Sequence, residues 1–184
     1  MSDSVLLVMD FQQGIVERLG DASVVDAATR AIAAARAKDI HVMFVRIGFR
    51  PGYPEVAGSN LAFAASAQAG DTMTEDHPAT QLHGALQRRP DEPIVLKRRV
   101  SAFSGSDLAV LLRAAGASQL VLAGIATSGV VLSTLRQAAD LDYRLTVLAD
   151  ACADRDAEVH RVLMEKVFPR QATVTTTDEW VKSL

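Results

Sequence analysis

Two ionisable residues follow short apolar runs of the kind that form buried strands. Asp10 comes directly after the run 4–9, and Lys97 ends the run 93–97. In an open parallel sheet, ligands bind beyond the carboxyl ends of the strands. An acid and a lysine that emerge there from different strands can form a close pair in a partly dry cleft. Each would favour the charged form of the other and could exchange a proton with a substrate.

A purely structural interpretation of the same two residues also fits the sequence. Asp10 could cap the turn that follows it, and Lys97 could be a solvated strand end. Structural ion pairs perturb pKa values just as catalytic pairs do. The spacing alone therefore leaves the catalytic and the structural interpretations open.

Apolar runs alternate with segments of helical period along the chain. Because the runs lack a strict alternation of polar and apolar residues, they indicate strands that are covered on both faces, as in a parallel sheet. Strands joined by helices form right-handed crossovers and a three-layer sandwich. Strands are predicted at residues 4–9, 41–46, 93–97, 119–123, 144–148 and 172–176, and helices at 21–38, 107–115, 128–141, 155–167 and 178–184.

One irregular stretch, residues 47–90, interrupts this alternation and is rich in glycine and proline. Long segments of this kind inside a compact domain are usually lids or binding loops rather than linkers. The composition, 49% hydrophobic and 22% charged, is that of an ordinary globular protein. We therefore expect a single domain over residues 1–184.

Charge and hydropathy exclude several classes of protein. The formal net charge is -3, the pI is about 5.8 and no basic stripe is visible, so a nucleic-acid partner is not expected. No apolar run approaches the roughly 18 residues of a membrane span, and no positive charge precedes the first run as it would in a signal peptide. The single cysteine fits a reducing cytoplasm. The mean hydropathy of +0.15 favours a homodimer or homotetramer.

Three motifs occur in order at the ends of predicted strands. They are Asp10-Phe11-Gln12, Lys97 followed by Ser101-Ala102-Phe103, and Gly124-Ile125-Ala126-Thr127. With these motifs the chain resembles the isochorismatase-like (cysteine hydrolase) family over essentially its whole length. The resemblance implies a Rossmann-like α/β/α sandwich, and we expect its six-stranded parallel sheet to have the order 3-2-1-4-5-6.

The resemblance also implies roles for individual residues. Amidases of the family use an aspartate, a lysine and a nucleophilic cysteine, and by position Asp10 matches the aspartate and Lys97 the lysine. The turn Ile125, Ala126 and Thr127 matches one that often holds a non-proline cis peptide, here between Ile125 and Ala126. In the family this turn helps to aim backbone N–H groups at the developing oxyanion of the substrate.

The chain departs from the amidase pattern at the nucleophile. The family places its cysteine three residues after the threonine, where this chain has Val130, and valine has no nucleophilic atom. Cys152 follows the fifth predicted strand, a position more typical of a small buried hydrophobe. Serines near the motif, such as Ser128, are more typical of helix caps than of replacement nucleophiles.

Two functions remain open. Isochorismatases of the family also lack the cysteine and cleave a vinyl ether without a covalent intermediate, because their aspartate protonates the vinyl carbon and water attacks the resulting oxocarbenium ion. The sequence thus predicts a hydrolase that acts on a small metabolite through cysteine-independent Asp/Lys chemistry. For that, burial must raise the pKa of Asp10 against the lowering effect of Lys97. The alternative is an inactive family member that binds a small molecule or a protein partner.

The substrate pocket is expected to combine apolar walls with groups that hold an anion or a carbonyl. Guanidinium groups suit carboxylates, although Arg46 and its neighbour Arg50 could equally anchor the long loop. Nicotinamidases of the family carry metal-binding histidines beyond the second strand, and residues 46–53 contain none. We therefore expect neither a metal nor a cofactor. The pocket residues predicted are Phe11, Gln12, Arg46, Phe49, Tyr53 and Phe103.

Overall fold

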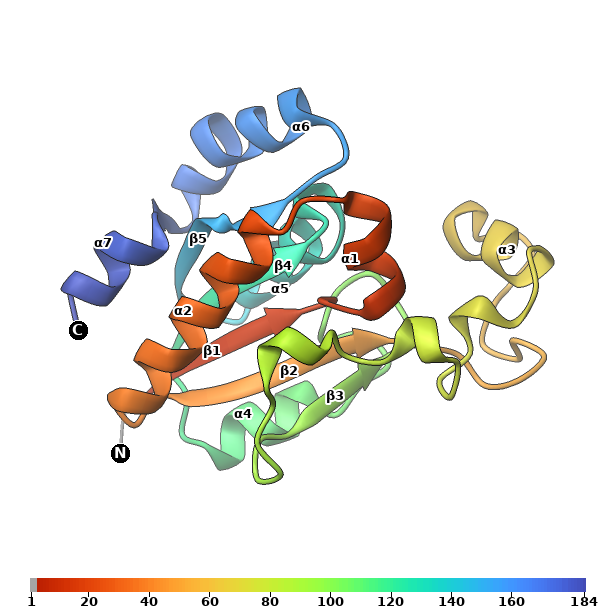
Figure 1. Ribbon diagram of the computed structural model, residues 1–184, viewed down its shortest axis with the longest axis horizontal. Coiled ribbons are helices and arrows are strands. Elements are labelled where there is room, and N and C mark those ends of the chain that lie inside the picture. The colour runs from red at the N-terminus through yellow and green to blue at the C-terminus, as the bar shows by residue number, and fades with distance from the viewer. Residues whose placement is uncertain (1–2) are drawn as a thin grey trace.

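The computed structural model describes residues 3–184, and six parallel strands form its central sheet (Figure 1). The strands lie in the order β3-β2-β1-β4-β5-β6, so the predicted order 3-2-1-4-5-6 is confirmed. Their bounds are β1 (Ser4–Met9), β2 (His41–Ile47), β3 (Ile94–Lys97), β4 (Gln119–Ile125), β5 (Arg144–Ala153) and β6 (Thr173–Thr175).

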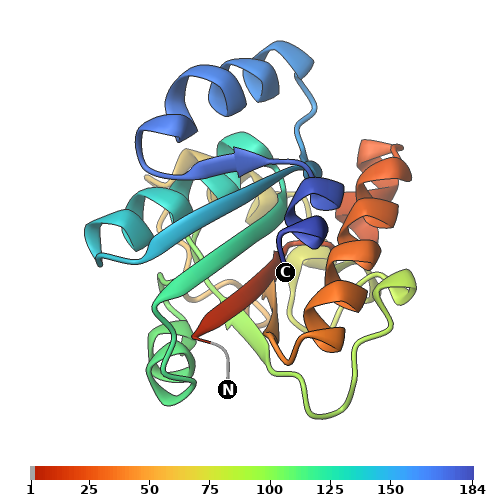
Figure 2. The ribbon, with the colours of Figure 1, turned by 90° about the vertical axis from the view of Figure 1, so that its left-hand side faces the viewer.

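Helices cover both faces of this sheet, which confirms the predicted three-layer α/β/α architecture. One face is covered by α2 (Ser23–Ala37) and α7 (Thr177–Lys182), and the other by α4 (Leu108–Ala114), α5 (Leu132–Asp140) and α6 (Ala157–Val162) (Figure 2). None of the helices in residues 3–184 is both long enough and apolar enough to cross a membrane.

The central strand β1 divides the core between the two faces. Leu6 and Val8 belong to the hydrophobic cluster under α2, whereas Leu7 and Met9 belong to the cluster under α4 and α5. All four side chains are completely buried. Burying both faces explains why this run is uniformly apolar rather than alternating. The same burial fixes the position of the residue that follows, Asp10, at the carboxyl edge of the sheet.

Several helix and strand bounds differ from those predicted. A short helix, α1 (Gln13–Leu19), was not expected, and it lies at the carboxyl edge of the sheet. The predicted helix 128–141 begins instead with a π-helical turn over Thr127–Val131, in which Gly129 leaves helical geometry with φ -97° and ψ -105°. The glycine allows this departure because it has no Cβ. Regular helix α5 therefore starts only after the turn.

The irregular stretch between β2 and β3 forms an excursion that projects beyond the sheet edge. It contains α3 (Leu61–Gln68) and three single turns of 3-10 helix. Figure 1 shows α3 standing away from the main body. Phe49, Tyr53 and Phe63 form a separate small hydrophobic cluster inside the excursion. The ring centroid of Phe49 lies 5.6 Å from that of Tyr53 and 5.2 Å from that of Phe63. The excursion therefore has a core of its own.

Candidate active site

Asp10 is the first residue beyond β1, and its backbone turns sharply there. Its φ is +57°, in the left-handed region, which aspartate tolerates better than most side chains. The backbone N–H of Asp10 donates a 2.8 Å hydrogen bond to the carbonyl of Val45 in β2. This bond prolongs the β1–β2 pairing by one residue beyond Met9.

Lys97 ends β3 and forms a buried ion pair with Asp10. Its Nζ lies 2.9 Å from Asp10 Oδ2 and donates a second hydrogen bond, of 3.1 Å, to the carbonyl of Arg99. Lys97 is 1% exposed and Asp10 is 5% exposed. The pair thus joins the ends of two strands that are separated in the sheet by β2.

One oxygen of the Asp10 carboxyl group is left without a partner. Oδ1 is buried and accepts no hydrogen bond from any described residue. Burial raises the pKa of Asp10, and this effect outweighs the lowering effect of Lys97. An unpartnered, buried oxygen on a carboxyl group with a raised pKa can carry a proton and deliver it to a bound molecule.

The turn beyond β4 lies beside the end of β1. The peptide bond between Ile125 and Ala126 is cis, as the resemblance implied. Gly124 pairs with Met9 across the two strands, and a Cβ at Gly124 would lie 3.2 Å from Met9 Cβ. Val130 is 2% exposed and belongs to the same hydrophobic cluster as Met9. The residue at the expected position of the nucleophile is therefore a buried hydrocarbon.

Two hydrogen bonds attach this turn to the segment after β5. The Thr127 hydroxyl lies 2.8 Å from His160 Nδ1, and the backbone N–H of Ser128 donates a 2.7 Å bond to Asp154 Oδ2. Burial lowers the pKa of His160, which favours the neutral imidazole. His160 and Asp154 were not predicted as site residues, because nothing in their local sequence points to a contact with residues 127–128.

Cys152 has the surroundings of a core residue. It is 4% exposed, and its Sγ lies 3.9 Å from the carbonyl oxygen of Leu122. Burial raises the pKa of its thiol to about 12. Because the thiolate is the nucleophilic form, this thiol is almost entirely unreactive near neutral pH.

The predicted pocket residues next to Asp10 are buried or hydrogen-bonded within the protein. Phe11 is completely buried under α2. Gln12 bridges two distant segments, because its Nε2 donates to the carbonyls of Ile47 and Thr80, and its Oε1 accepts from the Ile47 N–H. Gln12 therefore clamps Ile47, at the end of β2, and Thr80, within the excursion, onto the carboxyl edge of the sheet.

The remaining predicted pocket residues are divided between the excursion and the main core. Arg46 donates a 2.8 Å hydrogen bond to the carbonyl of Glu75. Phe49 and Tyr53 lie in the core of the excursion. Phe103 packs under α4 and α5, with its ring centroid 6.3 Å from that of Tyr143. Substrate contact by the six predicted pocket residues remains a prediction.

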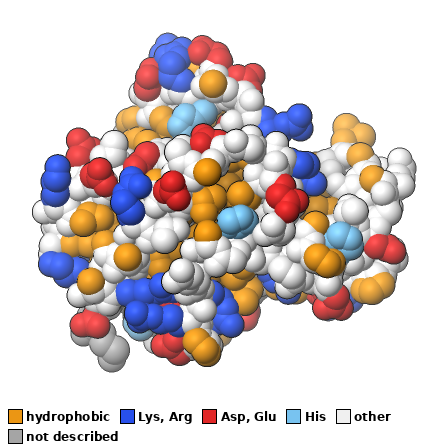
Figure 3. Space-filling view, in the orientation of Figure 1, with side chains coloured by type: hydrophobic (Ala, Val, Ile, Leu, Met, Phe, Trp, Pro, Cys, Tyr) orange, Lys and Arg blue, Asp and Glu red, His pale blue; other side chains and the backbone are white. Residues whose placement is uncertain are grey.

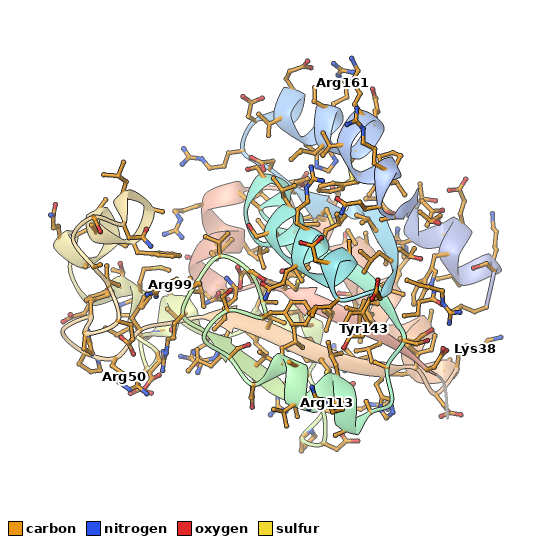
Figure 4. All side chains as sticks on the ribbon, turned by 180° about the vertical axis from the view of Figure 1, so that it is seen from behind. Lys38, Arg50, Arg99, Arg113, Tyr143 and Arg161 are labelled. Carbon is orange, nitrogen blue, oxygen red and sulfur yellow. The ribbon has the colours of Figure 1, made fainter. Side chains whose placement is uncertain are left out.

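Arginines attach the excursion to the segment after β3. Arg98 forms an ion pair with Glu75 and also hydrogen-bonds the carbonyl of Gly48. Arg99 donates a 2.9 Å bond to the carbonyl of Glu55, and Arg50 forms an ion pair with the Glu55 side chain. Figure 4 shows Arg50 and Arg99 on the side of the molecule from which the excursion projects.

Metal ligands do not gather anywhere in the described part of the chain. Residues 3–184 contain no group of three histidine, cysteine, aspartate or glutamate side chains that could hold a metal ion. The carboxyl edge of the sheet holds the buried Asp10–Lys97 pair and the turn after β4.

Comparisons with known proteins place the chain in a family. The model of the isochorismatase domain matches residues 4–179, and the chain belongs to the isochorismatase family. It is 32% identical to the uncharacterized isochorismatase family protein YecD of Escherichia coli O157:H7, over 98% of this chain and 96% of that protein. It is also 32% identical to the ureidoacrylate amidohydrolase RutB of Variovorax paradoxus strain S110, over 99% of this chain and 81% of that protein.

The fold is that of known members of this family. A crystal structure of a cysteine hydrolase from Pseudomonas syringae pv. phaseolicola 1448A superimposes with a TM-score of 0.90. The superposition covers 99% of this chain and 93% of that chain, at 23% sequence identity. A structural likeness at 23% sequence identity establishes the fold and not the activity.

Proposed function

We propose that this protein hydrolyses a small metabolite by a cysteine-independent route, with Asp10 as the acid and base and Lys97 as its electrostatic partner. The observation that carries the proposal is the state of the Asp10 carboxyl group. It is buried, its pKa is raised, and its Oδ1 has no partner among residues 3–184. A carboxyl group of this kind is suited to giving up a proton at a pH where an exposed aspartate would already be ionised.

A vinyl ether is the substrate type that fits an acid without a neighbouring thiol. In the proposed step, protonated Asp10 transfers its proton to the terminal vinyl carbon, and the ether oxygen stabilises the cation that forms. Water adds to this cation, and the ionised Asp10 accepts a proton from the water. The resulting hemiketal breaks down to a ketone and an alcohol, so that the net change is the addition of one water molecule.

Lys97 stabilises the intermediate stage of this cycle. When Asp10 has given up its proton, the buried carboxylate lies 2.9 Å from the Lys97 ammonium group. In surroundings of low polarity, this attraction offsets part of the cost of burying the negative charge. The same lysine therefore helps the acid to ionise during the reaction without preventing its protonation beforehand.

Hydrolysis of an amide or ureide would need a nucleophile from a position other than 130, where the amidases of the family have their cysteine. Val130 offers none, and the Cys152 thiol has a pKa raised to about 12. The relation to a ureidoacrylate amidohydrolase still makes ureides part of the test. A family member that binds a ligand without turning it over is the alternative, and it predicts ligand-induced stabilisation with no product.

The test is turnover of a substrate panel by three forms of the protein. Purified wild type, Asp10→Asn and the double variant Asp10→Asn/Lys97→Met are incubated with vinyl ethers, amides, ureides and carbamoyl compounds, and products are identified by mass spectrometry. We expect the wild type to hydrolyse a vinyl ether and both variants to lose at least about 100-fold in kcat, the usual contribution of a general acid.

The double variant separates catalysis from folding. Asp10→Asn alone leaves the Lys97 charge buried without its partner, which costs about 3–5 kcal/mol in comparable cases. Replacing both residues removes that charge, so the double variant keeps its thermal unfolding transition. Full activity in a folded double variant would exclude Asp10 from the mechanism. Absence of any wild-type product across the panel would favour the non-catalytic alternative.

A cysteine at position 130 provides a second test of the site. If only the nucleophile distinguishes this chain from amidases of its family, Val130→Cys should gain amidase activity or become acylated at the new thiol. The matched control is Val110→Cys, because Val110 is an exposed valine on α4. Acylation of position 130 alone supports the proposed geometry. Equal labelling of both positions, or of neither, contradicts it.

A further inference from the structure

A hollow lies where α1 and the loop after β5 meet the turn beyond β4. Its volume is about 280 Å³, slightly below the usual range for ligand pockets, so it suits a small molecule. The residues that line it come from three separate segments of the chain. They are Ile15, Arg18, Leu19, Ile125, Ala126 and Arg155. The lining is therefore hydrocarbon with two cationic groups and no acidic residue.

The two arginines of this hollow are free to bind a ligand. Arg18 and Arg155 are both exposed, and neither guanidinium group forms a hydrogen bond or an ion pair with residues 3–184. The arginines that the sequence suggested as anion ligands differ in this respect. Arg46 donates to the carbonyl of Glu75, and Arg50 is paired with Glu55.

The acidic residues nearest in sequence form no ion pair with Arg18 or Arg155 in the described part of the chain. Asp154 Oδ2 accepts the N–H of Ser128, and Asp156 Oδ1 accepts two backbone N–H groups at the start of α6. Glu17 accepts a 2.6 Å hydrogen bond from the Gln13 side chain. Each of these carboxylates thus has a partner other than Arg18 or Arg155. On the face of the molecule shown in Figure 3, hydrophobic side chains are exposed near the centre, with histidine and charged side chains around them.

We propose that Arg18 and Arg155 bind the carboxylate of a small acid whose hydrocarbon body lies on Ile15, Leu19 and Ala126. A guanidinium group offers several N–H donors in one plane and forms strong hydrogen bonds with a carboxylate. A neutral molecule of the same shape gains the apolar contact but not these bonds. The lining includes Ala126 from the turn beside the Asp10 strand but neither Asp10 nor Lys97, so this binding does not depend on the proposed function.

The test is binding of benzoate and its neutral analogue benzamide, measured by calorimetry and by amide chemical shifts. The variant is Arg18→Gln/Arg155→Gln, and the matched control is Arg113→Gln/Arg170→Gln. Arg113 and Arg170 are exposed, and both lie outside the hollow; Arg113 extends from α4 (Figure 4). Both double variants change the net charge by the same amount.

Benzoate should bind the wild type and the control variant equally and perturb the amide resonance of Ala126. In Arg18→Gln/Arg155→Gln its Kd should rise at least about tenfold, which corresponds to about 1.4 kcal/mol. Benzamide should bind more weakly than benzoate to the wild type and should not distinguish the variants. Raising the salt concentration should weaken benzoate binding only where both arginines are present.

Several results would overturn this inference. Equal benzoate affinity of the wild type and Arg18→Gln/Arg155→Gln would do so, as would equal affinity of the wild type for benzoate and benzamide. A wild type that does not bind benzoate at millimolar concentration would also overturn it. The same titration with Asp10→Asn/Lys97→Met separates the two proposals. Benzoate binding that persists in this variant, together with no turnover by the wild type, would support the anion site and refute the proposed function.

Discussion

The Asp10 carboxyl group is subject to two opposing influences. Burial disfavours its charge, and Lys97 at 2.9 Å favours it. Burial has the larger effect, so the pKa is raised. The sequence could suggest the pair, because both residues follow apolar runs whose carboxyl ends meet at one edge of a parallel sheet. It could not reveal which influence is larger, since the answer depends on how completely folding removes water from both groups.

The raised pKa of Asp10 predicts an unusual pH dependence of the reaction. An acid catalyst must carry its proton, so kcat/KM for a vinyl ether should be highest below the raised pKa and fall as the pH increases through it. A profile from pH 4 to pH 9 measures this, with Asp91→Asn, at an exposed loop position, as the control. A rate that instead increases with pH over this range would mean that Asp10 acts first as a base.

Cys152 is predicted to be dispensable for activity. Its thiol is buried and its pKa is raised to about 12, so Cys152→Ala should leave kcat/KM unchanged and cost about 1 kcal/mol of stability through lost packing. A thiol reagent should label the folded protein far more slowly than the unfolded protein. Loss of activity in Cys152→Ala without loss of folding would contradict the cysteine-independent route.

The elements that hold the site are β1, β4 and the turn between β4 and α5. Gly124 lets them approach, because a Cβ there would lie 2.9 Å from Val131 Cγ2 and 3.1 Å from the Met9 carbonyl oxygen. The six strands could be predicted from their apolar runs. The start of α5 could not, because the backbone of Gly129 is determined by the packing of the turn against its neighbours rather than by helical period.

A methyl group at position 124 tests this close approach. Gly124→Ala should lower the free energy of unfolding by about 1–3 kcal/mol, as overpacking does elsewhere, and should reduce activity because Val131 and the turn must move. Gly58→Ala is the matched control, since a Cβ there meets no atom within 4 Å. Thermal unfolding and kcat/KM are measured on both variants. Equal behaviour of the two would show that the strands do not need a glycine here.

The excursion between β2 and β3 is held by contacts between residues that are far apart in the sequence. Gln12 binds Ile47 and Thr80, and Arg98 binds Gly48 and Glu75. The sequence identified residues 47–90 as one irregular unit. It could not show that Gln12 holds this unit in place, because side-chain bonds to a distant backbone leave no periodic pattern. The position of Gln12 next to Asp10 predicts a pocket residue, and its contact with a substrate remains a prediction.

Removing this clamp should loosen the excursion while the sheet remains folded. Gln12→Leu leaves buried backbone groups of Ile47 and Thr80 without partners, which costs about 1–3 kcal/mol per group. Limited proteolysis should then cut within the excursion first, whereas Gln13→Leu, which removes only an exposed bond to Glu17, should leave the cleavage pattern unchanged. Identical patterns for the two variants would show that the excursion is held by other contacts.

We expect the Asp10 carboxyl group to hold a proton at a pH where an exposed aspartate has lost it. Infrared difference spectra between the wild type and Asp10→Asn/Lys97→Met, recorded across a pH titration, measure this directly through the C=O band of a protonated carboxyl group. We predict that the band persists well above the ordinary aspartate pKa of 3.8 and disappears only at higher pH. A band that vanishes at or below the ordinary value would contradict the account.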